Sequence, residues 1–111
     1  MVALRVTSEF WISAFKKRLE GQGIPIFVIQ KGDNLAGAII IRVSNLRGNA
    51  KVFIQEPTLT GERSWIEFLN GSDIEIEAFL ENQIRFDVDL WILEVEEHTG
   101  INFFEEFLLQ T

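Results

Sequence analysis

Apolar residues recur at helical spacing in two segments of this chain. The first segment predicts a helix over 9–20, with Ser8 as its N-cap. The second predicts a helix that begins after Ser72 and ends at Asp87, because Ser72 and Glu75 have the spacing of a capping box. The apolar stripes of these two helices consist of Trp11, Ile12, Phe15 and Leu19, and of Ile76, Phe79, Leu80 and Ile84.

Shorter segments show the alternation, or the unbroken apolar runs, that are typical of strands. They predict strands at 24–30, 36–43, 50–55, 63–69, 90–96 and 101–104. The run Ile39-Ile40-Ile41 has no polar face, so its strand should lie inside a sheet that is covered on both sides. Turn sequences separate the strands at 31–34, 47–49, 70–71 and 97–100.

The predicted order is one helix, four strands, a second helix and two strands. Strands joined by short turns run antiparallel, so we expect a mostly antiparallel sheet of five to six strands. Two amphipathic helices covering one face of that sheet give a two-layer α+β fold. A length of 111 residues fits a single domain over 1–111.

The composition excludes several kinds of chemistry. The chain has no Cys, so it has no disulfide, thiol nucleophile or Cys-type zinc site. It has one His, His98, which falls in a predicted exposed turn beside two glutamates. We therefore predict no catalytic residue and no cofactor.

The start of the chain lacks the basic and long apolar regions of a signal peptide. The longest uncharged apolar-rich stretch, 34–41, is far shorter than the roughly 20 residues that cross a bilayer. These features predict a cytoplasmic protein that does not bind membranes. The net charge of −7 and pI of about 4.6 oppose nucleic-acid binding, despite the basic run at 16–18.

The charges are unevenly distributed along the chain. The first 51 residues carry eight basic and three acidic residues, and the remainder carry two basic and fourteen acidic ones. This asymmetry predicts a molecule with a basic and an acidic side, unless the fold interleaves the two halves on one surface.

Five short patterns stand in order along nearly the whole chain. They are Trp11-Ile12-Ser13-Ala14, Gly32-Asp33, Ala36-Gly37-Ala38, Gly61-Glu62-Arg63-Ser64-Trp65 and Arg85-Phe86-Asp87-Val88-Asp89-Leu90-Trp91. With these patterns the chain resembles a family of short alphaproteobacterial proteins catalogued as domain of unknown function 1491. The resemblance implies a small cytosolic single-domain protein and carries no activity or catalytic residue.

Asp87 and Asp89 could serve two purposes. Their spacing suits two carboxylates that, with Glu94, bind a divalent metal ion in a small hydrolase, with a nearby arginine as electrophile. Alternatively, both aspartates accept backbone hydrogen bonds in a turn and pair with an arginine. We favour the second interpretation, because no further ladder of ligands follows them.

The leading hypothesis is a non-catalytic module that binds another protein or a second copy of itself as a homodimer. The acidic face of the second predicted helix, with Asp73, Glu77 and Glu81, is one candidate surface, although such faces usually serve only solubility. A second surface combines Arg63 and Trp65 with the segment from Arg85 to Trp91. The third is the apolar C-terminal segment around Phe107, which needs cover from its own core or a neighbour.

Overall fold

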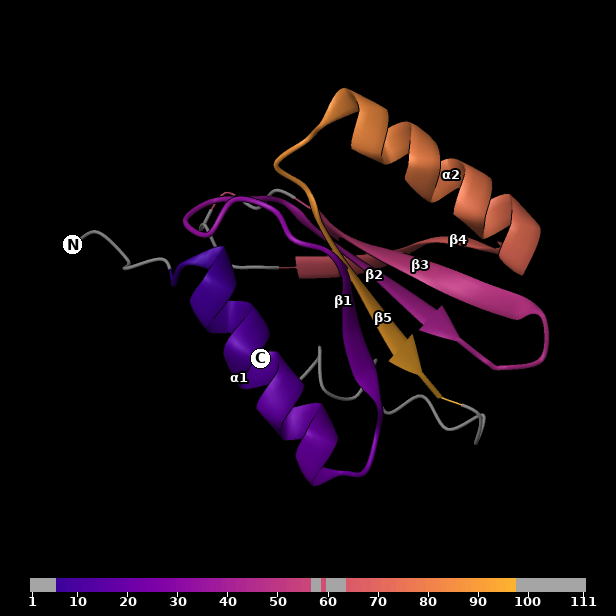
Figure 1. Cartoon of the computed structure of the whole chain (residues 1–111), viewed down its shortest axis with the longest axis horizontal. Helices are drawn as coiled ribbons and strands as arrows, with labels where there is room; N and C mark the ends of the chain where they lie inside the picture. The colour runs from indigo at the N-terminus through magenta and orange to yellow at the C-terminus, as the bar shows by residue number, and fades with distance from the viewer. Residues whose placement is uncertain (1–5, 57–58, 60–63, 98–111) are drawn as a thin grey trace.

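The computed structural model describes residues 6–56, 59 and 64–97 (Figure 1). It has two helices and a five-stranded open sheet, which confirms the predicted α+β class. The elements are α1 (Ser8–Gly21), β1 (Ile26–Gln30), β2 (Ile39–Ser44), β3 (Asn49–Glu56), β4 (Ser64–Ser72), α2 (Asp73–Phe86) and β5 (Trp91–Glu96). Their order is the predicted one. The sixth strand predicted at 101–104 and the turn with His98 lie outside the described residues.

The strands lie side by side in the order β1-β5-β2-β3-β4. All neighbours are antiparallel except β2 and β5, which run parallel, so the sheet is mostly antiparallel as predicted. The Ile39-Ile40-Ile41 run lies in β2, at the centre of the sheet, and all three side chains are buried. An unbroken apolar run therefore marks a strand that is covered on both faces.

The two helices cover opposite faces of the sheet, and the prediction that they share one face in a two-layer fold is wrong (Figure 1). Alternate residues of a strand point to opposite faces. Ile39 and Ile41 pack with α1, whereas Ile40 packs with α2. The central strands are apolar on both faces, and each face must be shielded from water by a helix. Each helix therefore buries a separate half of the core.

The α1 core is the larger of the two. It contains Ile12, Phe15, Leu19, Ile24, Ile26, Ile39, Ile41, Phe53, Trp91, Leu93 and Val95. The α2 core contains Ile40, Ala50, Val52, Ile76, Leu80, Leu90 and Ile92. The helix stripes predicted from the sequence supply the helical members of both cores.

Two local predictions need correction. Thr7, not Ser8, is the N-cap of α1, and its side chain accepts a hydrogen bond from the amide of Phe10. Ser8 is buried instead, and its hydroxyl donates to the carbonyl of Gly37 at 2.7 Å. Gly71 does not turn the chain, because it pairs with Ala50 and β4 continues to Ser72. Ser72 then caps α2, as predicted.

The two helices place the basic run and two of the acidic residues on opposite faces of the sheet, although each helix also carries charges of the other sign. The basic run at 16–18 lies on α1 and the acidic residues Glu77 and Glu81 lie on α2, so the sheet stands between them. In the described part of the chain, neither helix has the length and apolar character needed to cross a membrane.

Candidate interaction surface

Three segments that are far apart in the sequence meet at one end of the sheet. They are the start of α1, the 31–38 loop and the 87–90 loop, and we call this meeting point the loop junction. The amide of Ser8 donates to the carbonyl of Leu35 at 3.2 Å, and the amide of Asp33 donates to the carbonyl of Asp89 at 3.0 Å. In Figure 1 it lies where α1 begins and α2 ends. Direct backbone hydrogen bonds therefore fix the three segments to one another.

Two glycines allow the loops to approach this closely. A Cβ atom on Gly32 would overlap the carbonyl oxygen of Asp89 and the indole of Trp91. A Cβ atom on Gly37 would come within 2.5 Å of the same carbonyl oxygen. Neither glycine has a positive φ, so their role is close packing of backbones and not an unusual conformation.

Aspartates and a tryptophan hold the shape of the loops. The Asp33 carboxylate accepts the amides of Leu35 at 3.2 Å and Ala36 at 2.9 Å. The Asp87 carboxylate accepts the amide of Asp89 at 3.0 Å, in the turn that follows α2. The buried indole of Trp91 donates to the carbonyl of Asp33 at 2.7 Å. Trp91 therefore supports the junction from the core, whereas the sequence suggested it as a contact residue.

Large apolar side chains at and beside the loop junction are exposed to solvent. Phe86 is 87% exposed and Val88 is 77% exposed, on either side of Asp87. Leu35 and Phe10 are also exposed, on the neighbouring loop and on α1. Side chains of this size gain free energy when they leave water, by about 1.5–3 kcal/mol each for full burial. Their grouping on segments joined by hydrogen bonds distinguishes them from singly exposed apolar residues, which are common on surfaces.

The rim of the loop junction is predominantly acidic. Glu9, Asp33, Asp87 and Asp89 belong to its three segments and are exposed. The exposed basic residues of the same region are Lys31 and Arg85. The junction therefore combines apolar centres with an excess of negative charge.

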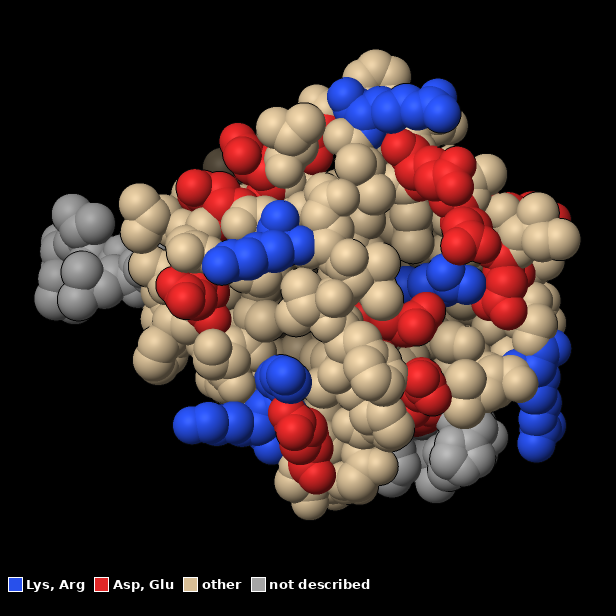
Figure 2. Space-filling model, in the orientation of Figure 1, with Lys and Arg blue, Asp and Glu red and all other residues tan. Residues whose placement is uncertain are grey.

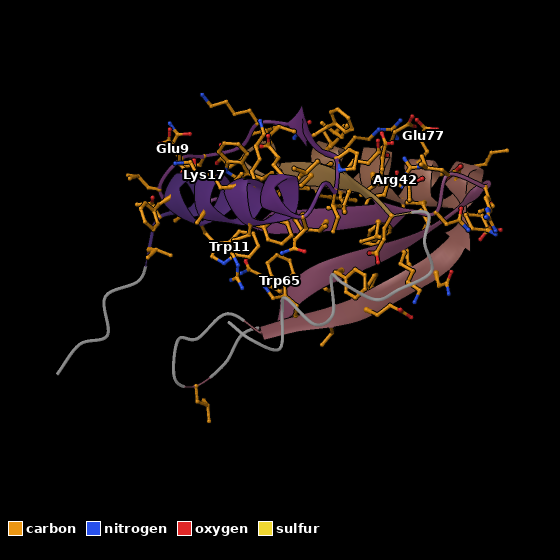
Figure 3. The ribbon with its side chains drawn as sticks, turned by 90° about the horizontal axis from the view of Figure 1, so that it is seen from below. Glu9, Trp11, Lys17, Arg42, Trp65 and Glu77 are labelled. Carbon is orange, nitrogen blue, oxygen red and sulfur yellow. The ribbon has the colours of Figure 1, made fainter. Side chains whose placement is uncertain are left out.

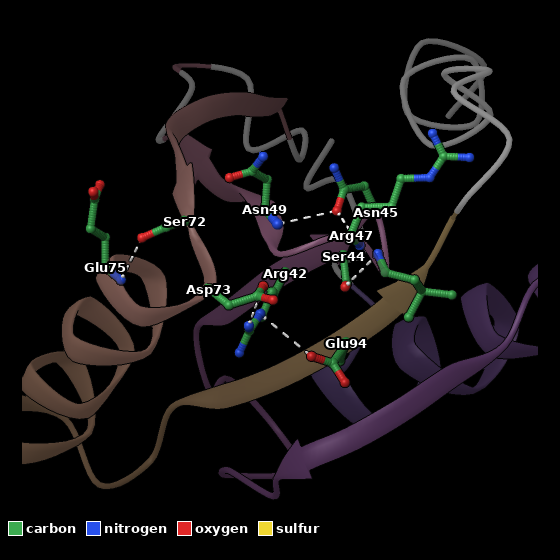
Figure 4. A network of polar contacts seen from close by, with 10 residues as sticks. Arg42, Ser44, Asn45, Arg47, Asn49, Ser72, Asp73, Glu75 and Glu94 are labelled. Atoms are coloured by element: carbon green, nitrogen blue, oxygen red, sulfur yellow. Dashed lines mark hydrogen bonds and ion pairs between the residues drawn. The ribbon is translucent and has the colours of Figure 1, made fainter.

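A second polar cluster lies on the α2 side of the sheet. Arg42 donates from Nη2 to Oδ1 of Asp73 at 2.8 Å, and its Nε lies 3.4 Å from Oε1 of Glu94 (Figure 4). The Nε is buried and makes no hydrogen bond, so the contact with Glu94 is an ion pair only. Arg42 thus joins β2 to the start of α2 and to β5.

These contacts test the metal-site interpretation of Asp87, Asp89 and Glu94 against the interpretation in which the aspartates stabilise a turn. Asp87 holds the turn, and Glu94 pairs with Arg42 along β5. Across the described residues, no group of three or more His, Cys, Asp or Glu side chains is placed to hold a metal ion. The structure does not bring these three carboxylates together.

The other predicted contact residues are distributed over the molecule. Asp73 pairs with Arg42, while Glu77 and Glu81 are exposed on α2. Trp65 is half-buried beside Trp11, with ring centroids 5.2 Å apart, at the margin of the α1 core (Figure 3). Arg63 and Phe107 lie outside the described residues.

Sequence reasoning missed Arg42, Leu35 and Phe10. Arg42 carried a usable signal, since it interrupts the apolar run of a central strand and a buried guanidinium needs acidic partners. Leu35 and Phe10 carried none, because a single apolar residue in a turn or helix gives no indication of exposure.

Comparison with known proteins adds a family and three related structures. The family model described as "Protein of unknown function (DUF1491)" matches residues 6–105. A crystal structure of a DUF1491 family protein from Caulobacter crescentus CB15 is 28% identical, with a TM-score of 0.77, over 90% of this chain and 93% of that one.

Two solution structures are similarly related. The protein Atu0922 from A. tumefaciens is 33% identical, with a TM-score of 0.74, over 85% of this chain and 87% of that one. An NMR structure of a DUF1491 family protein from Caulobacter crescentus CB15 is 29% identical, with a TM-score of 0.76, over 91% of this chain and 94% of that one. A search of curated proteins gives no significant match. The family model covers most of the chain, and the chain therefore belongs to the DUF1491 family.

Proposed function

We propose that this protein is a non-catalytic interaction module and that the loop junction is its binding surface. The observation that carries this proposal is the exposure of Phe86, at the end of α2, and of Val88, on the following loop that backbone hydrogen bonds hold in place. A partner would bury these side chains without first ordering the loop, which lowers the entropic cost of binding.

The chemistry of the surface defines the partner. Aromatic and apolar anchors near the centre of an interface supply most of its binding free energy, and a polar rim surrounds them. The loop junction offers Val88 and Leu35 as anchors, together with Phe86 directly beside it at the end of α2, and more acidic than basic residues surround them. We therefore expect a protein partner with an apolar patch bordered by Lys or Arg.

A pull-down with surface variants tests this proposal. The Phe86→Glu/Val88→Glu variant should lose about tenfold or more of the partner retained from an alphaproteobacterial lysate, because two anchors become charged. The variant should remain folded, since both side chains are exposed and surface changes cost about 0.5 kcal/mol or less. Quantitative mass spectrometry of the retained proteins, with circular dichroism of each variant, provides the measurement.

The matched control is Ile74→Glu. Ile74 is 82% exposed and also belongs to α2, but it lies at the opposite end of that helix. This variant should retain the partner at the level of the unmodified protein. Equal retention by both variants, or no protein retained above background by the unmodified chain, would contradict the proposal.

A further inference from the structure

We infer that the free edge of β1 accepts an extended segment of a partner protein as an added strand, and that this segment is apolar with basic side chains. This surface is separate from the loop junction, and the inference does not depend on that junction. It rests on three features of β1, namely its position, its side chains and the charges beside it.

β1 is an edge strand. It pairs with β5 on one side, and no described residue pairs with its other side. The amide of Glu96 donates to the carbonyl of Pro25, and hydrogen-bonded pairs alternate with non-hydrogen-bonded pairs along an antiparallel ladder. With the observed register, the amides and carbonyls of Ile26 and Val28 therefore point to the free edge. They are the groups that an added strand would pair with.

The side chains of β1 are unusual for a strand at the edge of the described sheet. Phe27, Val28 and Ile29 are 44–56% exposed, and the strand contains no charged residue. Natural proteins protect edge strands with charges, prolines or bulges, which prevent pairing with other chains. Here Pro25 precedes the strand and a bulge lies between Val28 and Gln30. These features limit the pairing to a short segment and leave its centre apolar.

The charges beside β1 indicate the nature of the added segment. Glu94 and Glu96 of β5 point to the same face as Phe27, which is the α2 side of the sheet. The same face carries further exposed acidic residues on α2, including Glu77, farther from β1 where α2 packs on β3 and β4, and Figure 2 shows acidic side chains gathered over that part of the molecule. Arg42 lies beside Glu94 and already pairs with it and with Asp73, and Arg85 lies at the far end of α2. Lys or Arg on the added strand would complement this face.

The same charges oppose a second copy as the occupant. Antiparallel pairing of β1 with β1 of another copy uses a two-fold axis perpendicular to the joined sheet, so like faces remain on the same side. The acidic α2 sides of the two copies would then lie edge to edge and repel each other. A basic segment from a different protein meets no such repulsion.

Synthetic peptides test the inference by NMR titration of the labelled full chain. An eight-residue peptide of alternating Lys and Val should shift the β1 resonances and slow the hydrogen exchange of the Ile26 and Val28 amides. It should bind about tenfold or more tightly than its Glu/Val counterpart, because the face it meets is acidic. A Lys/Val peptide N-methylated at every residue should not bind, since neither of its edges can donate hydrogen bonds to β1.

Variants of the protein separate edge pairing from general charge attraction. Val28→Pro removes an amide that points outward, so it should abolish peptide binding while preserving the pairing of β1 with β5. Glu96→Lys should weaken binding of the Lys/Val peptide several-fold, whereas Glu20→Lys on α1 should leave it unchanged. Phe86→Glu/Val88→Glu should also leave it unchanged, which separates this result from that of the loop junction.

Three outcomes would overturn the inference. The first is equal binding of the N-methylated peptide, which would indicate charge attraction without strand pairing. The second is peptide-induced shifts that map away from β1. The third is a concentration-dependent dimer with protected β1 amides in the absence of peptide, which would make a second copy the occupant.

Discussion

Replacing Gly32 with Ala should lower the free energy of unfolding by about 3 kcal/mol, at the upper end of the usual cost of overpacking. The added Cβ atom would overlap the carbonyl oxygen of Asp89 and contact the backbone of Leu90. These atoms belong to the polypeptide backbone, so a change of side-chain rotamer cannot relieve the overlap. The 31–38 loop would have to move away from the 87–90 loop, and the hydrogen bond from Asp33 to Asp89 would be lost. Urea denaturation provides the measurement.

Gly21→Ala is the control for this substitution. A Cβ atom on Gly21 would have no neighbour within 4 Å, and the residue lies in the last turn of α1. Alanine favours the helix there, so this variant should equal or slightly exceed the stability of the unmodified protein. If Gly32→Ala were as stable as Gly21→Ala, the close contact between the two loops would be wrong.

Replacing Arg42 with Met should lower the free energy of unfolding by about 2 kcal/mol, less than the loss seen when a fully buried ion pair is broken. The Arg42 side chain is 14% exposed, so its charge is largely removed from water and is stabilised by Asp73 and Glu94. Methionine keeps much of the apolar stem but leaves the two carboxylates without their common partner. The variant should regain part of the lost stability at high salt, which screens repulsion between the carboxylates.

Lys51→Met is the matched comparison, because Lys51 also lies in the sheet and pairs with Glu67 at 3.2 Å. Both side chains of that pair are substantially exposed, so its loss should cost well under 1 kcal/mol. If thermal denaturation showed that Arg42→Met and Lys51→Met lose similar free energies of unfolding, Arg42 would contribute no more than an exposed surface residue.

The elements of the fold could be predicted because their signals are local. The stripe from Trp11 to Leu19 and the cap at Ser72 each lie within one helix, and both predictions agree with the structure. The Ile39-Ile40-Ile41 run likewise identified the central strand. The faces that α1 and α2 cover could not be assigned, because the same run supplies apolar side chains to both faces of the sheet.

The candidate surface depends on contacts between distant residues. Asp33 and Asp89 are 56 positions apart, and nothing in either segment indicates that their backbones meet. The sequence around Gly32 predicts only a turn, whereas the structure shows that Gly32 lets the 31–38 loop pack closely against the backbone of the 87–90 loop. The segment from Arg85 to Trp91 was identified as distinctive, but its parts have different roles. Asp87 shapes the turn, Trp91 supports it from the core, and Phe86 is exposed.

Site-specific photo-crosslinking tests the central claim most directly. A photoreactive phenylalanine analogue at position 86, introduced into the full chain in alphaproteobacterial cells, should give one discrete adduct with a partner protein. The same analogue at position 74, which is also highly exposed on α2, should give none. Leu35→Glu should remove the adduct at position 86, because Leu35 belongs to the same loop junction. The claim is contradicted if position 86 gives no adduct, or if positions 86 and 74 give the same pattern.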